Sequence, residues 1–182
     1  MTTGRHSKVW GVVLTLLCWF CQLPLHAQSP LVLQNEHHAK LIGRHLAVYT
    51  DTLKSLRFHD IQTPQYQSQF LPYDKDAPNF GNRDLVLWNR ITIVNQSDRQ
   101  WQLVVDNYSL DTLEFYWPDS NGEYRQLISG RSQPHSQRQY QTGVYVFDLP
   151  VNPGDTAVCY LKVRSYFMQY PLFVMSREEF VS

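Results

Sequence analysis

The chain has 182 residues, carries 16 basic and 16 acidic side chains, and is 14% aromatic. Removal of residues 1–27, interpreted below as a signal peptide, leaves 14 basic and 16 acidic side chains, a formal charge of −2. So small an imbalance, with no cluster of Lys or Arg, argues against a nucleic-acid-binding protein and against a polybasic membrane patch. The remaining residues, about 155, suit one domain with a single core.

The N-terminus has the three parts of a secretory signal peptide. Arg5 and Lys8 precede an apolar run over residues 9–20, and the small residue Ala27 follows at the expected cleavage site. The run is shorter than the roughly 20 residues that a membrane-spanning helix needs. We therefore expect residues 1–27 to be removed on export, with the mature chain on the extracytoplasmic, periplasmic side of the membrane.

The first part of the mature chain has a mixed pattern. Residues 28–44 have no clean hydrophobic period and are interpreted as a lead-in segment. Residues 45–50, HLAVYT, are apolar enough to predict a short strand. Residues 51–61 predict a short helix, with Asp51 or Thr52 as its N-cap.

A long polar connection, residues 62–84, follows the predicted helix. Its length is typical of a loop that packs against a sheet. Three aromatic side chains are expected to hold it there: Phe70, Tyr73 and Phe80.

From residue 85 onward, short strands alternate with turns. The predicted strands cover residues 85–94, 101–108, 112–117, 124–129, 144–149, 157–164 and 171–175. Asn121 and Gly122 are expected to supply the two positive-φ residues of a tight hairpin turn. Pro153 and Gly154 fit the centre of a type II turn. Seven short strands with little helix predict an all-β fold over residues 45–182: a jelly-roll-like antiparallel β-sandwich with one short N-terminal helix.

Cys159 is the one cysteine that remains after removal of the signal peptide, so no internal disulfide is expected. It alternates with Ala157, Leu161 and Val163 on one apolar face of a predicted strand. We interpret it as a buried structural thiol and not as a nucleophile, because no neighbouring residue would lower its pKa.

The predicted strand over residues 85–94 has two different faces. The more uniformly apolar face should point into the sandwich and consists of Leu85, Leu87, Asn89, Ile91 and Ile93. Trp88 and Arg90 lie on the opposite face, about 7 Å apart along the strand. Such a pair suits a carbohydrate or an anion, because the ring stacks on a sugar and the guanidinium donates paired hydrogen bonds. The alternative is structural: the 62–84 connection covers Trp88, and Arg90 stacks on it or pairs with an acid such as Asp106.

Other candidate sites have weaker patterns. Three acidic residues could help to hold Ca²⁺, although without EF-hand spacing: Asp106, Asp111 and Glu114. Three histidines lie in a polar segment where solvated histidines are usual: His37, His38 and His45. We therefore expect no metal and no cofactor. No nucleophile elbow, HExxH helix, glycine-rich phosphate loop or paired-carboxylate pattern occurs, which argues against an enzyme.

The order of several segments resembles one known family. Asn79-Phe80-Gly81 leads to Trp88-Asn89-Arg90, and the predicted strand pair in residues 101–117 has Asp111 between its strands. The Asn121–Gly122 hairpin, residues 129–140 and residues 144–165 complete the series. Over residues 41–180 the chain resembles the type 2 extracellular sensory domain of bacterial seven-transmembrane receptors with diverse intracellular signalling modules (7TM-DISM).

The resemblance implies a jelly-roll β-sandwich similar to carbohydrate-binding modules, displayed outside the cytoplasmic membrane. In such receptors the domain precedes seven transmembrane helices and a kinase or cyclase output module. The implied partners are therefore those modules and a small-molecule or carbohydrate ligand. Two features depart from the family. Gly130-Arg131 stands where the family often has Gly-Asp, and the sequence stops at Ser182, where a linker to the first membrane helix is expected.

These observations favour an extracytoplasmic ligand-sensing domain of a 7TM-DISM-type receptor, without catalysis. A freestanding secreted carbohydrate-binding or adhesion module is the alternative, and a small hydrolase is a third hypothesis. If a sugar binds, four residues are expected to contact it: Trp88, Arg90, Tyr116 and Arg138. Tyr116 shares a strand face with Thr112 and Glu114, and the apolar Leu113, Phe115 and Trp117 lie on the other face.

Overall fold

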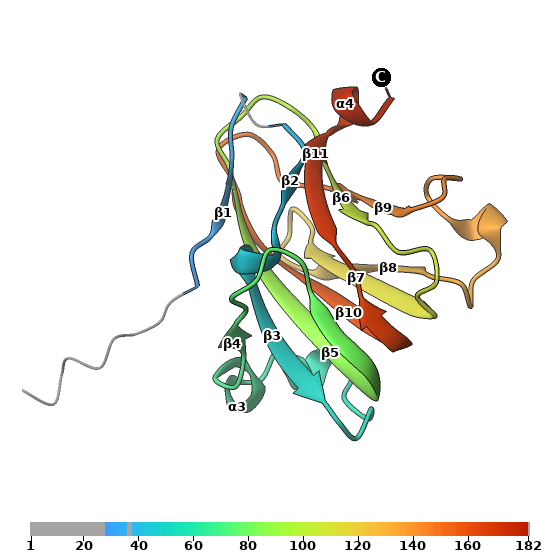
Figure 1. Ribbon diagram of the computed structural model, residues 1–182. Helices are drawn as coiled ribbons and strands as arrows, with labels where there is room; N and C mark the ends of the chain where they lie inside the picture. The colour runs from blue at the N-terminus through green and yellow to red at the C-terminus, as the bar shows by residue number, and fades with distance from the viewer. Residues whose placement is uncertain (1–27, 36–37, 182) are drawn as a thin grey trace, which may run out of the picture.

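The computed structural model describes residues 28–35 and 38–181 (Figure 1). The predicted signal peptide over residues 1–27 lies outside the described residues, as do His37 and Ser182. No helix of the described part of the chain is long and apolar enough to cross a membrane.

Two β-sheets form the body of the protein. The larger sheet has the order β4-β3-β5-β10-β7-β8, and β1 pairs with β5 outside this path. Its strands are β1 (Leu31–Leu33), β3 (Leu46–Asp51), β4 (Leu71–Pro72), β5 (Asn79–Asn95), β7 (Thr112–Pro118), β8 (Tyr124–Ser129) and β10 (Thr156–Gln169). The smaller sheet has the order β2-β11-β6-β9 and consists of β2 (Lys40–Leu41), β6 (Trp101–Val105), β9 (Tyr145–Leu149) and β11 (Leu172–Ser176). The predicted antiparallel β-sandwich is confirmed, with β1 and β5 as a parallel pair.

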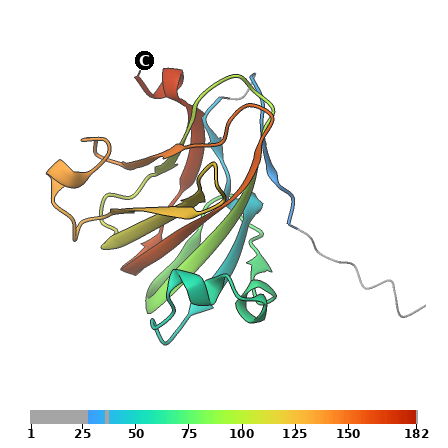
Figure 2. The same cartoon turned by 180° about the vertical axis from the view of Figure 1, so that it is seen from behind.

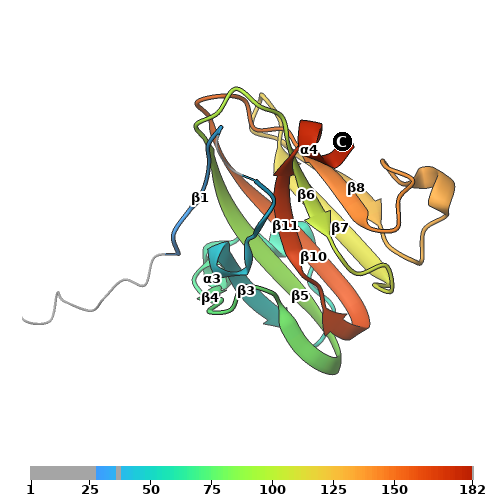
Figure 3. The same ribbon diagram turned by 45° about the horizontal axis from the view of Figure 1, so that its top comes forward.

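The two layers enclose the main hydrophobic core, to which both sheets contribute (Figure 3). The predicted inward face of β5 is confirmed, because Leu87, Ile91 and Ile93 are part of this core. Asn89 is fully buried on the same face, and its polar atoms are satisfied. Its Nδ2 donates to the Leu161 carbonyl at 2.9 Å, and Tyr170 donates its hydroxyl to Asn89 Oδ1 at 3.2 Å. A buried amide is tolerated there because it is hydrogen-bonded.

Two short strands lie within residues 28–44, which the sequence analysis assigned to a lead-in segment. Leu31 and Leu33 of β1 are buried in the main core, as is Ile42 after β2. β1 and β2 have three and two residues, too few for a hydrophobic period to be visible. These residues are therefore an integral part of the sandwich.

Helical structure is limited to short segments. The α-helices are α2 (Phe58–Ile61), α3 (Pro64–Gln67) and α4 (Arg177–Val181), and the 3-10 helices are η1 (Gly43–His45) and η2 (His135–Gln137). The prediction of a helix over residues 51–61 was wrong in its start and its cap, because α2 begins at Phe58. Asp51 ends β3 instead, and its carboxylate accepts the amides of Lys54 and Leu56 at 2.8 and 2.9 Å. These bonds hold a turn before the helix and leave Asp51 outside it.

The two turns predicted from glycine are present, with one correction. β7 and β8 pair antiparallel, so the hairpin is confirmed. Its turn has a single positive φ, at Gly122 and not at Asn121, because residues 119–123 form a longer loop bridged by the Gly122 amide and the Asp119 carbonyl at 2.9 Å. Gly154 has a φ of 85°, and the Asp155 amide donates to the Asn152 carbonyl at 3.0 Å, as a type II turn requires.

Cys159 is fully buried in the main core, as predicted. Burial in an apolar environment raises the pKa of its thiol to about 12. We expect native protein to remain unmodified by a thiol-specific reagent at pH 8, and urea-unfolded protein to react fully, because the thiolate is the reacting species. Titration of thiols under both conditions measures this. Rapid reaction of the folded protein would contradict it.

Candidate ligand-binding site

A second hydrophobic cluster covers the outer face of the larger sheet. α2 and α3, in the connection between β3 and β5, lie against this face (Figure 2). The buried members of the cluster are Ala47, Ile61, Phe70, Val86, Trp88, Tyr116 and Tyr160. The larger sheet is thus covered on both sides over part of its area, which explains why both faces of β5 have apolar residues.

Trp88 lies at the centre of this cluster and is 0% exposed. Phe58 of α2 packs over it with ring centroids 6.4 Å apart, and also stacks on Tyr116 at 4.2 Å with the rings 4° from parallel. The Lys162 ammonium lies 5.0 Å from the Trp88 ring centroid. In this conformation neither face of the indole is free to contact a ligand, which agrees with the structural role considered for Trp88. The ring that covers it comes from α2, whereas the cover was expected from residues 62–84.

Arg90 fixes α3 to the sheet. Its Nη1 donates to the carbonyl oxygen of Gln67 at 3.3 Å and to the Gln67 side-chain oxygen at 2.8 Å. Its guanidinium lies 4.8 Å from the centroid of the Phe70 ring. Arg90 therefore stacks on Phe70 and binds α3. The partners expected for it in a structural role were Trp88 or an acid such as Asp106.

Tyr116 marks the edge of the covered area. Its hydroxyl donates to Glu114 Oε2 at 2.5 Å, and Gln126 Nε2 donates to the same oxygen at 2.9 Å. Lys162 Nζ lies 3.0 Å from Glu114 Oε1. Burial, followed by the bond to Glu114, raises the pKa of Tyr116 well above its usual range. The polar groups of this network already satisfy one another.

Arg138 belongs to a different part of the molecule. It lies in the segment between β8 and β9, and its guanidinium is 4.8 Å from the centroid of the Tyr145 ring. The Tyr145 ring is buried in the main core. The structure thus brings Trp88, Arg90 and Tyr116 together on one sheet face and leaves Arg138 apart from them.

A groove opens between the two sheets at the edge formed by β8 and β9. These strands are the last of their respective sheets, and no strand of the described part of the chain pairs with the free edge of either. The groove has a volume of about 370 Å³. Its lining residues are Phe115, Trp117, Leu127, Gln139, Phe147, Asp148 and Pro150. Two neighbouring hollows of about 380 and 350 Å³ also have Pro150 in their walls. This is a concave, largely apolar surface with three aromatic side chains and a small polar side, as small-molecule sites usually are.

Trp117 is the aromatic residue best placed to contact a ligand in this groove. Its ring stacks on Phe115 with centroids 5.5 Å apart. Of the three tryptophans in the described residues, Trp88 and Trp101 are buried, whereas Trp117 is half-exposed. Trp117 also lines one of the neighbouring hollows.

Asp148 forms the polar side of the groove. Gln139 donates its Nε2 to Asp148 Oδ2 and accepts the Asp148 amide at 3.3 Å. Tyr140 donates its hydroxyl to Asp148 Oδ1 at 2.7 Å. Burial, followed by this bond to Asp148, raises the pKa of Tyr140. The carboxylate is thus oriented by neighbouring side chains, and Asp148 and Gln139 are both among the residues that line the groove.

Strand alternation placed Trp117 correctly on the core side of its strand, with Leu113 and Phe115. The groove was not predicted, because it depends on how β8 and β9, the last strands of the two sheets, lie relative to each other. Gln139 and Asp148 had no distinguishing pattern in the sequence, and their roles depend on the pairing of β9 with β6.

The other candidate residues make contacts of their own, and His37 lies outside the described residues. In the described part of the chain, no group of three or more His, Cys, Asp or Glu side chains could hold a metal ion. Asp111 pairs with Arg131 at 2.6 Å, and Glu114 belongs to the Tyr116 network. His38 Nδ1 lies 2.8 Å from Glu179 Oε1. This side-chain hydrogen bond is the main reason why the pKa of the Glu179 carboxylate is lowered.

Comparison with known proteins identifies the family. A search of curated proteins found no match. Among solved structures, the chain is similar to the enzymatically active domain of bacteriophage CBA120 tailspike protein 4, at 13% identity and a TM-score of 0.32. That alignment covers 72% of this chain and only 18% of the tailspike chain. The model of the 7TMR-DISM extracellular 2 family matches residues 43–176, close to the extent expected from the sequence. The chain therefore belongs to the 7TMR-DISM extracellular 2 family, a family of extracytoplasmic sensory domains.

Proposed function

We propose that this chain is the ligand-sensing domain of a seven-helix signalling receptor and that it binds a small carbohydrate without converting it. In an intact receptor it would act on its own seven membrane helices and, through them, on a kinase or cyclase output module. Family membership supports the receptor context. A freestanding secreted carbohydrate-binding module is the second candidate, and the same groove would serve it.

The half-exposed indole of Trp117 in the groove beside Asp148 carries the proposal of a sugar ligand. Sugars have apolar faces that stack on aromatic rings, and their hydroxyl groups donate hydrogen bonds to carboxylates at the rim. Phe115 stacks on the Trp117 ring and restrains it, so little freedom would be lost when a ligand packs against it. The neighbouring hollows that share Pro150 would accommodate further sugar units.

The four residues expected from the sequence are a second candidate position. Trp88, Arg90 and Tyr116 would contact a ligand only if α2 moved away from the sheet and withdrew Phe58. Arg138 directly precedes Gln139, which lines the groove, and is the member of the set best placed to assist binding there. We therefore favour the groove.

Absence of catalysis is also part of the proposal. Glycoside hydrolysis normally needs two carboxyl groups on opposite sides of the scissile bond, about 5–10 Å apart. Asp148 is the one carboxylate among the described residues that line the groove, and both of its oxygens accept hydrogen bonds. We expect a broad glycosidase and esterase screen of the purified protein to give no turnover, and reproducible turnover abolished by Asp148→Asn would sink this part of the proposal.

Titration with neutral and acidic oligosaccharides, followed by NMR, tests the site. We expect chemical-shift changes at the Trp117 indole, Leu127 and Phe147, and at least a tenfold loss of affinity in Trp117→Ala, because truncation of a central tryptophan that acts as a binding hot spot costs about 2 kcal/mol or more. Tyr108→Ala is the matched control, since Tyr108 is 74% exposed and lies outside the groove. Shifts centred on Trp88 and Tyr116 would favour the second position instead. Silence across the whole panel would contradict carbohydrate binding.

A further inference from the structure

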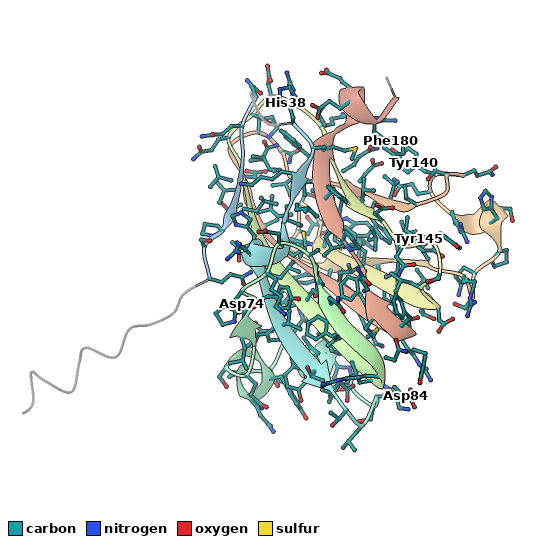
Figure 4. All side chains as sticks on the ribbon, viewed as in Figure 1. His38, Asp74, Asp84, Tyr140, Tyr145 and Phe180 are labelled. Carbon is teal, nitrogen blue, oxygen red and sulfur yellow. The ribbon has the colours of Figure 1, made fainter. Side chains whose placement is uncertain are left out.

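Residues 138–140, in the segment that leads into β9, contact two different parts of the molecule. Gln139 lines the groove, whereas the next residue, Tyr140, packs against α4. Figure 3 shows α4 and this segment at the same end of the sandwich, and Figure 4 shows Tyr140 and Phe180 close together. The Tyr140 and Phe180 rings are 5.5 Å apart at an interplanar angle of 73°, an edge-to-face contact.

Asp148 joins the two contacts. One carboxylate oxygen, Oδ2, accepts from Gln139 on the groove side, and the other, Oδ1, accepts from the Tyr140 hydroxyl at 2.7 Å. Gln102, which pairs with Asp148 across β6 and β9, donates its Nε2 to Asp148 Oδ1 at 3.0 Å and to the Tyr140 hydroxyl at 2.6 Å. Gln102 is 0% exposed, so it is a fixed support for both partners.

α4 has further attachments that do not involve the groove residues. The Arg177 amide donates to the Gln100 carbonyl at 2.9 Å, and its guanidinium donates to the Gln100 side chain at 3.1 Å. Glu179 accepts the Ser176 amide and hydroxyl at 3.2 and 3.1 Å. These contacts hold the start of α4. The packing of Phe180 on Tyr140 holds its C-terminal end.

We propose that Asp148 couples occupation of the groove to the position of α4, an inference that rests on the proposed function. A ligand hydroxyl that donates to Asp148 Oδ2 replaces Gln139 as its partner and releases the groove side of residues 138–140. The Tyr140 hydroxyl and ring then shift relative to Phe180, and the C-terminal end of α4 loosens. The family match ends at residue 176 and α4 begins at residue 177, so α4 is the element through which a change in this domain would leave it.

Mutation of Gln139 imitates the release without any ligand. In Gln139→Ala we expect the backbone order parameter of Phe180, measured by ¹⁵N NMR relaxation, to fall from about 0.85 to below about 0.6. Gln141→Ala is the matched control, because Gln141 is an exposed glutamine of the same segment and is not among the donors to Asp148. Unchanged order in Gln139→Ala, or equal loosening in both variants, would overturn the coupling.

Two further variants separate coupling from simple loss of packing. Tyr140→Phe keeps the ring beside Phe180 and removes its bond to Asp148, so α4 should loosen although no aromatic contact is deleted. Because coupling between two sites is reciprocal, Phe180→Ala should shift the side-chain amide resonances of Gln139 and the indole resonance of Trp117. No shift at either residue would refute the inference. None of these measurements uses a ligand, so their failure is distinct from a failure to bind carbohydrate.

Discussion

Replacement of Trp88 by alanine is expected to lower the free energy of unfolding by about 3–5 kcal/mol. Trp88 is the largest side chain of the cluster on the outer face of the larger sheet, and it is fully buried. Its removal would leave a cavity beside the stacked rings of Phe58 and Tyr116, whose backbones are held by α2 and β7 and cannot close the space. The loss combines the free energy that burial of the indole contributes in the parent protein with the cost of the cavity that remains.

Urea denaturation measures this change directly. Trp88→Phe should cost much less than Trp88→Ala, because it keeps an aromatic ring and removes an indole N–H that is buried without an acceptor among the described residues. Tyr108→Ala should stay within about 0.5 kcal/mol of the parent protein, because this side chain is 74% exposed. If Trp88→Ala proved as stable as the parent but lost carbohydrate binding, the role of Trp88 would be recognition, and α2 would have to be mobile.

The contrast between Trp88 and Trp117 shows what the sequence could and could not predict. Alternation assigned both residues to the correct face of their strands, Trp88 away from the main core and Trp117 toward it. Exposure then reversed the simple expectation, because α2 covers the outward tryptophan while the sandwich is open beside the inward one. Which face of a strand is exposed to solvent depends on contacts between segments that are distant in sequence. The alternation of residues along one strand does not reveal those contacts.

The same limit applies to the elements themselves. The longer strands β5, β7 and β10 were located because each has enough residues for a period of two to be visible, although residues 79–84 of β5 had been assigned to the polar connection. β1 and β2 are too short, and α2 and α3 have four residues each, so their bounds depend on local hydrogen bonds such as those of Asp51. Long segments with a regular hydrophobic period can be predicted from the sequence. The bounds of short connecting elements depend instead on the residues against which they pack.

A second large effect is expected at Gly130, which follows β8. Its φ is +115°, a backbone conformation that L side chains rarely adopt. A Cβ at this position would lie 2.5 Å from the Asp111 carbonyl oxygen and 2.9 Å from the Thr112 Cα. Backbone bonds from Arg131 to Leu110 at 2.8 Å and from Ser132 to Asp111 at 2.9 Å hold the two segments together at this point. The methyl group of an alanine would therefore force apart a contact made of backbone on both sides.

Gly130→Ala is accordingly expected to destabilise the protein by about 2–5 kcal/mol, through backbone strain and overpacking together. Gly154→Ala is the matched control, because Gly154 also has a positive φ, +85°, but a Cβ there would meet nothing within 4 Å. It should lose only the strain, roughly 1–2 kcal/mol. Urea denaturation of both variants separates the two causes, since the difference between them reports the clash alone. Equal losses would mean that residues 110–112 yield to the added methyl group.

The Arg131–Asp111 ion pair joins the same two segments, but 67% of the arginine side chain is exposed. Arg131→Ala should therefore cost less than about 1 kcal/mol, so the close backbone approach at Gly130, and not the neighbouring charge, fixes this end of β8 to the start of β7.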